Sequence, residues 1–162
     1  MKILIVTQYY YPERFSTTNI AETFVRLGNQ VTVLTSKPSY GFNEIPEEYK
    51  DVKSEEINGV KVYRVNTHKR GKNKISLSLN YLSFYANAKC FVRKLKEDFD
   101  VVLAISLSPV ISICPALVYA KKHNIPAVLY CEDIWPESPV SAGVIKNSGL
   151  IYKFIYKWSK SI

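Results

Sequence analysis

Four short apolar runs recur along the chain, and each is followed by a polar stretch. They are Ile3–Thr7, Val31–Thr35, Val101–Ile105 and Ala127–Tyr130. Valine, isoleucine and leucine follow one another in these runs instead of alternating with polar residues. Continuous apolar runs of this length are typical of strands that are buried on both faces of a parallel sheet. The pattern therefore predicts a parallel sheet covered by helices.

Helical segments separate these runs. Thr17 or Thr18 is placed to cap the first helix, Gly28 to stop it, and Ile20, Phe24 and Leu27 fall on one of its faces. A strand followed by a helix and a second parallel strand forms a right-handed crossover. We therefore expect an α/β, doubly wound, mainly parallel Rossmann-like sheet with helices on both faces. The expected helices cover residues 17–27 and 109–122, and a further one begins at Ser76 or Ser78 and ends at residue 96.

One segment interrupts this alternation. Val52–Glu56 and Val60–Val65 are strand-like, and Asn58-Gly59 lies between them. Asn-Gly between two such runs is a strong hairpin signal, so a β-hairpin is expected near residues 52–65, at the edge of the sheet. The segment 36–50 is expected to be a long loop. The last segment, Asn147–Ile162, has an apolar face at helical spacing.

Composition fits one folded domain with anionic partners. The 162 residues are 47% hydrophobic and 22% charged, and the formal net charge is +8. A basic balance favours nucleic acid, acidic lipid or phosphorylated ligands as partners. The chain has no nucleic-acid-binding motif, so nucleic acid is not expected to bind. Three widely spaced cysteines in apolar runs indicate buried, reduced thiols, and none has the spacing of metal ligands. No apolar run reaches the roughly 18 residues that span a bilayer.

Three carboxylates follow the last apolar run. Glu132, Asp133 and Glu137 surround Trp135 and Pro136. Ligands of open α/β sheets bind outside the carboxyl ends of the strands, and mutual repulsion makes such a cluster costly for the fold alone. The cluster is therefore a candidate site. The alternative is an ordinary helix cap beside a packing tryptophan.

The first strand–helix junction is a candidate anion site. Arg14 precedes the small hydroxyl residues Ser16, Thr17 and Thr18, and a helix N-terminus of this kind can hold phosphate. The junction has no glycine, so neither a dinucleotide fingerprint nor a P-loop is present. A plain capped helix is the alternative. Tyr10 offers a stacking surface nearby.

The junction after the third run carries two further hydroxyl groups. Ser106 and Ser108 stand at the strand end, just before Pro109. They are candidates for ligand contact, and a plain helix cap is the alternative.

Basic residues gather before the second expected helix. Lys69, Arg70, Lys72 and Lys74 precede a segment rich in leucine, tyrosine and phenylalanine. A basic cluster beside exposed aromatic residues is typical of an element that lies on an acidic membrane surface. A solvated loop is the alternative.

Several of these motifs together resemble one enzyme family. They are Gln8–Glu13 after the first strand, Lys37–Tyr40, Glu55–Val62 and the run Asp133-Ile134-Trp135-Pro136-Glu137-Ser138. The chain is similar over essentially its whole length to the amino-terminal domain of family 4 glycosyltransferases. The capsule, O-antigen and exopolysaccharide transferases of bacteria are the most similar subgroup.

The resemblance implies a GT-B enzyme, in which residues 1–162 form a single Rossmann-like amino-terminal domain and the carboxy-terminal, donor-binding domain is absent from this chain. The implied activity is retaining transfer of a sugar from a nucleotide-sugar, which is a substrate, to a polyprenyl-diphosphate-linked saccharide. No metal or cofactor is implied. The implied location is cytoplasmic, peripheral at the inner face of the cytoplasmic membrane. The paired glycines of the family's first loop are missing here.

Chemistry and resemblance together assign roles to the candidates. Carboxylates stabilise the oxocarbenium-like state of glycosyl transfer, and one of them can orient or deprotonate an acceptor hydroxyl. Asp133 is the first choice for this catalytic role and Glu137 the second. The residues expected to bind the acceptor or its phosphate are Tyr10, Arg14, Ser16, Thr17, Thr18, Ser106, Ser108 and Trp135.

Two other functions remain open from the sequence. The first is a non-catalytic Rossmann-like binding or assembly subunit that docks a partner through its terminal helix. The second is a complete nucleotide-binding enzyme, which the missing glycine fingerprint disfavours.

Overall fold

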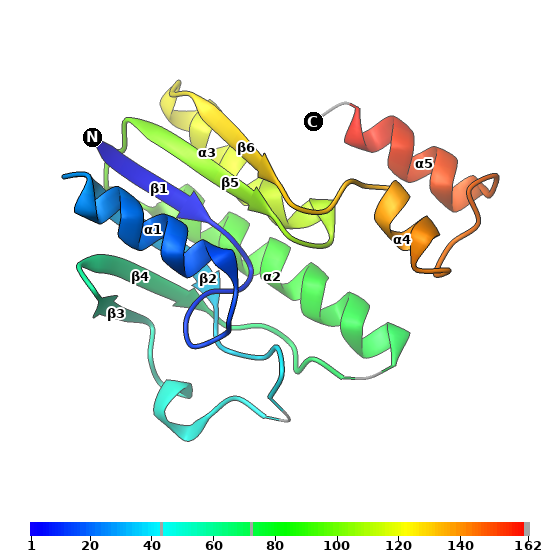
Figure 1. Ribbon diagram of the computed structural model, residues 1–162, viewed down its shortest axis with the longest axis horizontal. Helices are drawn as coiled ribbons and strands as arrows, with labels where there is room; N and C mark the ends of the chain where they lie inside the picture. Colours follow the sequence, from blue (N-terminus) through cyan, green and yellow to red (C-terminus); the bar gives the residue numbers. More distant parts are fainter. Residues whose placement is uncertain (43, 72, 161–162) are drawn as a thin grey trace.

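The computed structural model describes residues 1–42, 44–71 and 73–160. Six strands form one sheet in the order β3-β4-β2-β1-β5-β6 (Figure 1). All neighbouring pairs are parallel except β3 with β4. The doubly wound Rossmann-like fold expected from the sequence is therefore confirmed. The strands are β1 (Lys2–Val6), β2 (Gln30–Ser36), β3 (Ser54–Ile57), β4 (Val60–Val65), β5 (Val101–Ser106) and β6 (Ala127–Cys131).

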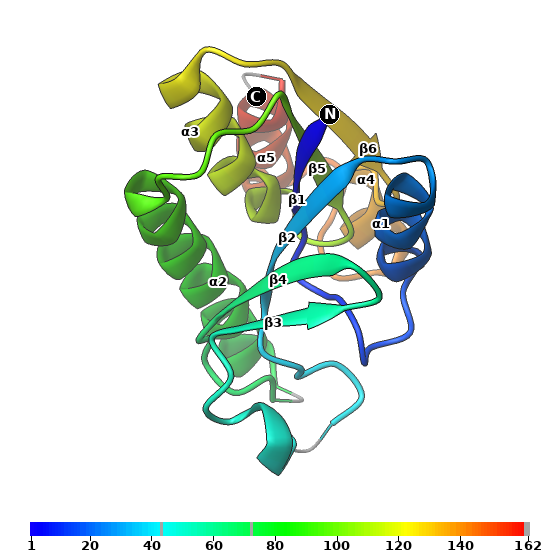
Figure 2. The same cartoon turned by 90° about the vertical axis from the view of Figure 1, so that its left-hand side faces the viewer.

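Helices cover both faces of the sheet. Helix α1 (Ser16–Arg26) lies on one face, and α2 (Lys74–Lys94) and α3 (Cys114–His123) lie on the other (Figure 2). Alternate residues of β1 point to opposite faces, so Ile5 joins the apolar cluster under α1 and Leu4 joins the cluster under α2 and α3. The continuous apolar runs thus supply two cores at once.

Three helix starts differ from expectation. Helix α3 begins at Cys114 and not near residue 109, because Val110–Ile113 form a 3₁₀ turn, η2. The expected cap of α1 at Thr17 or Thr18 is wrong, because the helix begins at Ser16 after Phe15, which supplies no side-chain cap. The Thr17 hydroxyl instead donates to the carbonyl of Tyr9 at 3.1 Å. Helix α2 begins two residues before the earlier of its two expected starts, because the Asn73 side chain accepts a hydrogen bond from the Ser76 amide at 2.7 Å.

The hairpin prediction is confirmed. Strands β3 and β4 pair antiparallel, with Asn58 and Gly59 at positive φ in the turn between them. Both turn residues adopt the left-handed conformation that Asn-Gly favours. The long loop before the hairpin contains one short 3₁₀ turn, η1 (Glu47–Tyr49).

The expectation that β6 is buried on both faces is wrong. Val128, Leu129 and Tyr130 are 51%, 54% and 46% exposed. Strand β6 lies at the edge of the sheet with β5 as its neighbour, and its whole length is exposed. An apolar run identifies a strand, but it does not reveal whether anything covers that strand. The expected burial of the cysteines fails as well, because Cys90 and Cys131 are exposed.

Two helices follow β6, beyond its carboxyl end (Figure 1). They are α4 (Glu137–Ser141), which the sequence did not predict, and α5 (Leu150–Ser159). Leu150, Ile151 and Phe154 of α5 are largely exposed. The expected contribution of Ile162 to this helical face lies outside the described residues. Among the helices that the structure describes, none has both the length and the apolarity needed to cross a bilayer.

Candidate functional site

Three loops meet at the carboxyl edge of the sheet. They follow β1 (residues 7–15), β5 (residues 107–109) and β6 (residues 132–136). Strand β1 has β2 as its neighbour on one side and β5 on the other, so the direction in which strands are added reverses at β1. Ligands of doubly wound folds bind at such a reversal of strand order. Each of the three loops contains one cis X–Pro bond, at Pro12, Pro109 and Pro136.

The acidic loop after β6 is held against the two neighbouring loops. The backbone amides of Glu132 and Asp133 both donate to the carbonyl of Ser106, at 3.0 and 3.2 Å. The Glu132 carboxylate accepts a hydrogen bond from the hydroxyl of Ser16 at the start of α1. Residues 116 positions apart thus join two of the candidate loops, and no local sequence pattern predicts this pairing.

The two catalytic candidates are placed differently. The Asp133 side chain is half-buried and makes no hydrogen bond or ion pair within the described parts of the chain. Glu137 opens α4, is exposed, and accepts a hydrogen bond from the Tyr152 hydroxyl of α5 at 3.3 Å. Asp133 is therefore the carboxylate that is free to meet a substrate hydroxyl.

Trp135 and Ser108 are in direct contact. The Trp135 indole N–H donates to the Ser108 hydroxyl at 3.2 Å, which joins the loop after β6 to the loop after β5. Both residues line a cavity of about 540 Å³ beside α2.

The start of α1 faces a second cavity, of about 620 Å³. Arg14, Ser16 and Thr18 are among its lining residues. The first amides of a helix lack intrahelical acceptors, and Phe15 offers no side-chain cap, so these N–H groups and the nearby guanidinium favour an anion. The buried Thr18 hydroxyl has no partner within the described residues.

Three other candidates lie inside the fold. Tyr10 and Thr17 are fully buried, and Ser106 is almost so. Burial raises the pKa of Tyr10 to about 12. None of the three lines either of the two cavities at this edge. Their contact with an acceptor or phosphate stays a prediction. In this structure they are part of the protein interior beneath the loops.

Glu13 is a buried carboxylate whose structural role the sequence did not predict. It is 4% exposed and accepts hydrogen bonds from the backbone amides of Ser39 at 2.8 Å, Tyr40 at 2.6 Å and Tyr10 at 3.3 Å. These bonds join the loop after β1 to the loop after β2. Burial raises the pKa of the Glu13 carboxyl, while the three hydrogen bonds and Arg64 act in the opposite direction.

The raised pKa of Glu13 predicts a pH dependence of stability. The folded protein holds the Glu13 proton more tightly than the unfolded chain does. This contribution to the free energy of unfolding is therefore fully present below the ordinary glutamate pKa of about 4.3, and it is lost as the pH rises through the folded pKa. Glu13→Gln should remove that loss, which urea denaturation at a series of pH values measures. The exposed Glu48→Gln is the control, and parallel curves for Glu13→Gln and the parent protein would contradict the assignment.

Arg64 on β4 is a second buried charged residue that connects loops of the site. Its side chain is inaccessible to solvent, is paired with Glu55 of β3, and lies over the ring of Tyr49 at 4.8 Å. It donates to the backbone carbonyls of Ser36 at 3.2 Å and Tyr11 at 2.5 Å. Arg64 thus ties the hairpin to the loops after β1 and β2.

The expected membrane-facing residues divide into two groups. Lys69 and Lys74 are exposed, and Lys69 pairs with Glu44 at 3.1 Å. Arg70 is half-buried over the rings of Tyr9, Tyr40 and Tyr81, with its guanidinium 4.9–5.6 Å from their centroids. Arg70 therefore packs against the protein. Lys72 lies outside the described residues.

Over residues 1–42, 44–71 and 73–160, no three His, Cys, Asp or Glu side chains are grouped so that they could hold a metal ion.

Comparisons with known proteins support the fold. No protein-family model and no curated protein matches the sequence. The structure is similar to that of CalG4, the calicheamicin glycosyltransferase, with a TM-score of 0.52 and 14% identity over 94% of this chain. The chain spans 40% of the length of CalG4. The C-terminal domain (residues 78–226) of PF1911 hydrogenase from Pyrococcus furiosus also matches, with a TM-score of 0.47 and 19% identity over 79% of this chain and 89% of that domain. The likeness to CalG4 shows a Rossmann-like fold of the kind found in that glycosyltransferase.

Proposed function

We propose that the protein is the acceptor-binding half of a retaining glycosyltransferase. The observation that carries the proposal is the acidic loop after β6, which a hydrogen bond between Glu132 and Ser16 holds beside the start of α1, next to the strand-order reversal, while Asp133 stays unpaired in the described residues. The glycosyltransferase-like fold is consistent with it. In this proposal the sugar passes from a nucleotide-sugar to a lipid-linked saccharide of surface polysaccharide synthesis.

Each part of the site has a role in that reaction. The Asp133 carboxylate orients the acceptor hydroxyl and accepts its proton as the new glycosidic bond forms. The bond between the anomeric carbon and the phosphate oxygen breaks, and the nucleoside diphosphate leaves from the same face of the sugar, so the configuration is retained. Negative charge on the loop favours the oxocarbenium-like state of the sugar. Arg14 and the free amides of α1 attract a diphosphate. The carboxylates and the phosphate groups supply this chemistry without a cofactor.

The donor site belongs to a second domain or subunit in this proposal. Exposed apolar side chains on β6 and α5, among them Leu129 and Phe154, offer a surface for such a partner. Membrane attachment is peripheral and uses the exposed Lys69 and Lys74. Cosedimentation with acidic vesicles should then weaken at high salt, because salt screens surface charges.

Transfer assays test the proposal. The purified chain alone, given a panel of nucleotide-sugars and a prenyl-diphosphate-linked sugar, should transfer nothing. The same chain joined to or expressed with a donor-binding domain should transfer sugar. Turnover by the chain alone would contradict the half-enzyme assignment. An absence of turnover with every donor-binding partner would contradict the enzymatic function.

The exposed face of α5 also supports a second candidate function. Leu150, Ile151 and Phe154 form an apolar surface on a helix beyond the sheet, as in a docking or assembly subunit without catalysis. Asp133→Asn distinguishes the two functions, because Phe154→Asp should disrupt the complex in both. In a docking subunit Asp133→Asn changes nothing, whereas in the enzyme it removes activity within an intact complex.

A further inference from the structure

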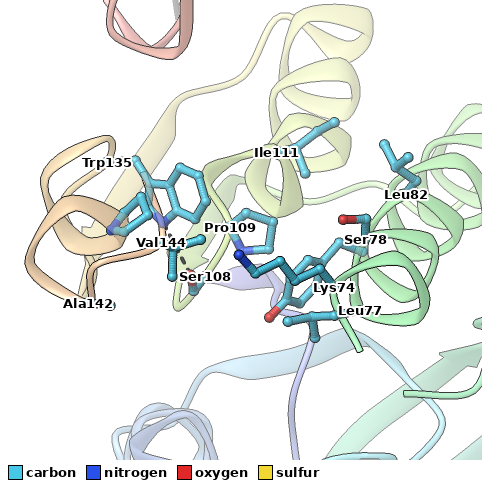
Figure 3. Close-up of a pocket in the computed structure, with 12 residues that line it drawn as sticks. Lys74, Leu77, Ser78, Leu82, Ser108, Pro109, Ile111, Trp135, Ala142 and Val144 are labelled. Carbon is cyan, nitrogen blue, oxygen red and sulfur yellow. Dashed lines mark hydrogen bonds between the residues drawn. The ribbon is translucent and has the colours of Figure 1, made fainter. Parts of the chain in front are cut away.

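The cavity beside α2 is an open cleft between two walls. One wall is α2, with Leu77, Ser78 and Leu82, and the other comes from the loop after β5 and the segment around α4 (Figure 3). Its volume of about 540 Å³ lies within the roughly 300–1,000 Å³ range of ligand sites. The hydrogen bond from Trp135 to Ser108 fixes the indole as part of the second wall.

The lining of the cleft is mainly hydrocarbon. Leucine, isoleucine, valine, alanine and proline side chains supply most of it, and Leu82 and Val144 are 51% and 53% exposed. Exposed apolar surface is stabilised when an apolar group removes it from water. The apolar residues of the lining are Leu77, Leu82, Pro109, Ile111, Pro139, Ala142 and Val144.

One cation enters this apolar space. Lys74 lies at the start of α2, and its ammonium points across the cleft toward Pro109 (Figure 3). Lys74 has no hydrogen bond or ion pair with any described residue. The helix N-terminus adds partial positive charge at the same place. An apolar groove with an unpaired cation at its end complements a molecule that has a hydrocarbon chain and an anionic head.

We propose that this cleft binds the hydrocarbon chain of an anionic amphiphile, with its phosphate head at Lys74. A saccharide alone fits poorly, because its hydroxyls would face Leu77, Ile111 and Val144 without hydrogen-bond partners. Inorganic phosphate alone would leave the apolar walls in water. Identifying the amphiphile with the lipid part of the acceptor rests on the proposed function, whereas the binding itself does not.

Tryptophan fluorescence tests the proposal directly. Trp158→Phe leaves Trp135, a wall of the cleft, as the single tryptophan of the chain. Farnesyl phosphate, added below its aggregation threshold, should change this fluorescence saturably, and inorganic phosphate should not. Leu82→Asn and Val144→Asn should each weaken binding about tenfold or more, as loss of apolar pocket contacts does. Lys74→Gln should weaken binding of farnesyl phosphate about fivefold but leave uncharged farnesol unaffected.

Matched variants separate the cleft from the general surface. Leu79 is an exposed leucine of α2 outside the cleft, and Lys94 is an exposed lysine at the far end of the same helix. Leu79→Asn and Lys94→Gln should bind farnesyl phosphate like the parent. No saturable change with farnesyl phosphate, or equal losses in Leu79→Asn and Leu82→Asn, would overturn the proposal.

Two further comparisons identify the type of hydrocarbon chain that the cleft binds, and they separate this inference from the proposed function. Dodecyl phosphate replaces the branched prenyl chain with a straight one, and tighter binding of farnesyl phosphate assigns a prenyl lipid. Farnesyl phosphate binding without sugar transfer under any condition would leave the cleft assigned and the enzymatic function rejected. Sugar transfer that is insensitive to Leu82→Asn and Val144→Asn would reject only the identification of the amphiphile with the lipid part of the acceptor.

Discussion

Asp133→Asn is expected to lower sugar transfer by the chain and its donor-binding partner about 10²–10⁴-fold, because the amide cannot act as a general base. The free energy of unfolding should change little. The backbone N–H of residue 133, which donates to the carbonyl of Ser106, is retained in the variant. The Asp133 carboxylate makes no hydrogen bond or ion pair within the described residues. Initial rates at saturating substrate and urea denaturation of the same samples measure both quantities.

The matched control is Asp98→Asn. Asp98 is exposed and lies near the amino-terminal end of β1, away from the candidate loops. Its variant should transfer sugar at the parent rate. Near-parent turnover by Asp133→Asn would remove Asp133 from the mechanism. A large loss of stability in Asp133→Asn would show that the carboxylate is a structural cap instead.

Arg64→Met is expected to destabilise the protein by about 3–5 kcal/mol, the usual cost of removing one partner of a buried ion pair. The variant leaves the Glu55 carboxylate and the carbonyls of Ser36 and Tyr11 without their donor. Methionine keeps most of the volume of the arginine stem, so the loss reports on the charge and hydrogen bonds. Urea denaturation measures it.

Two further variants show whether the pair itself causes that loss. Arg26→Met removes an exposed guanidinium that bonds Thr23 on the surface of α1, and it should cost less than about 1 kcal/mol. Adding Glu55→Gln to Arg64→Met should recover part of the stability, because no charge is then left without its partner. A double variant no more stable than Arg64→Met would show that the carbonyl contacts dominate.

The sequence predicts the central sheet well because its signals are local. Ile3–Val6 are apolar at every position, as are Val31, Val33 and Leu34, since both faces of these strands are covered, and Asn58-Gly59 marks a turn that needs positive φ. Strand β6 has the same apolar pattern with a different environment. Whether a strand is central or at an edge depends on strand order, which a local pattern does not contain.

The candidate site is predicted only in part, for a related reason. The strand-end motifs identify which loops meet, because carboxyl ends of parallel strands share one edge. The contacts that shape those loops join residues far apart in the chain. Glu13 reaches Ser39 and Tyr40, and Arg64 reaches Tyr11. A glutamate after a proline and an arginine in a strand look solvated in the sequence, and only the folded loops bury them.

The two edges of the sheet differ in how well they resist aggregation. Strand β3 is four residues long and carries Glu55 and Glu56, and short, charged edge strands discourage pairing with other molecules. Strand β6 offers Val128, Leu129 and Tyr130 with no charge among them. An uncharged apolar edge is a template for strand addition, so self-association of the concentrated chain should begin there and not at β3. Leu129→Lys is then the first substitution to try for a more soluble sample.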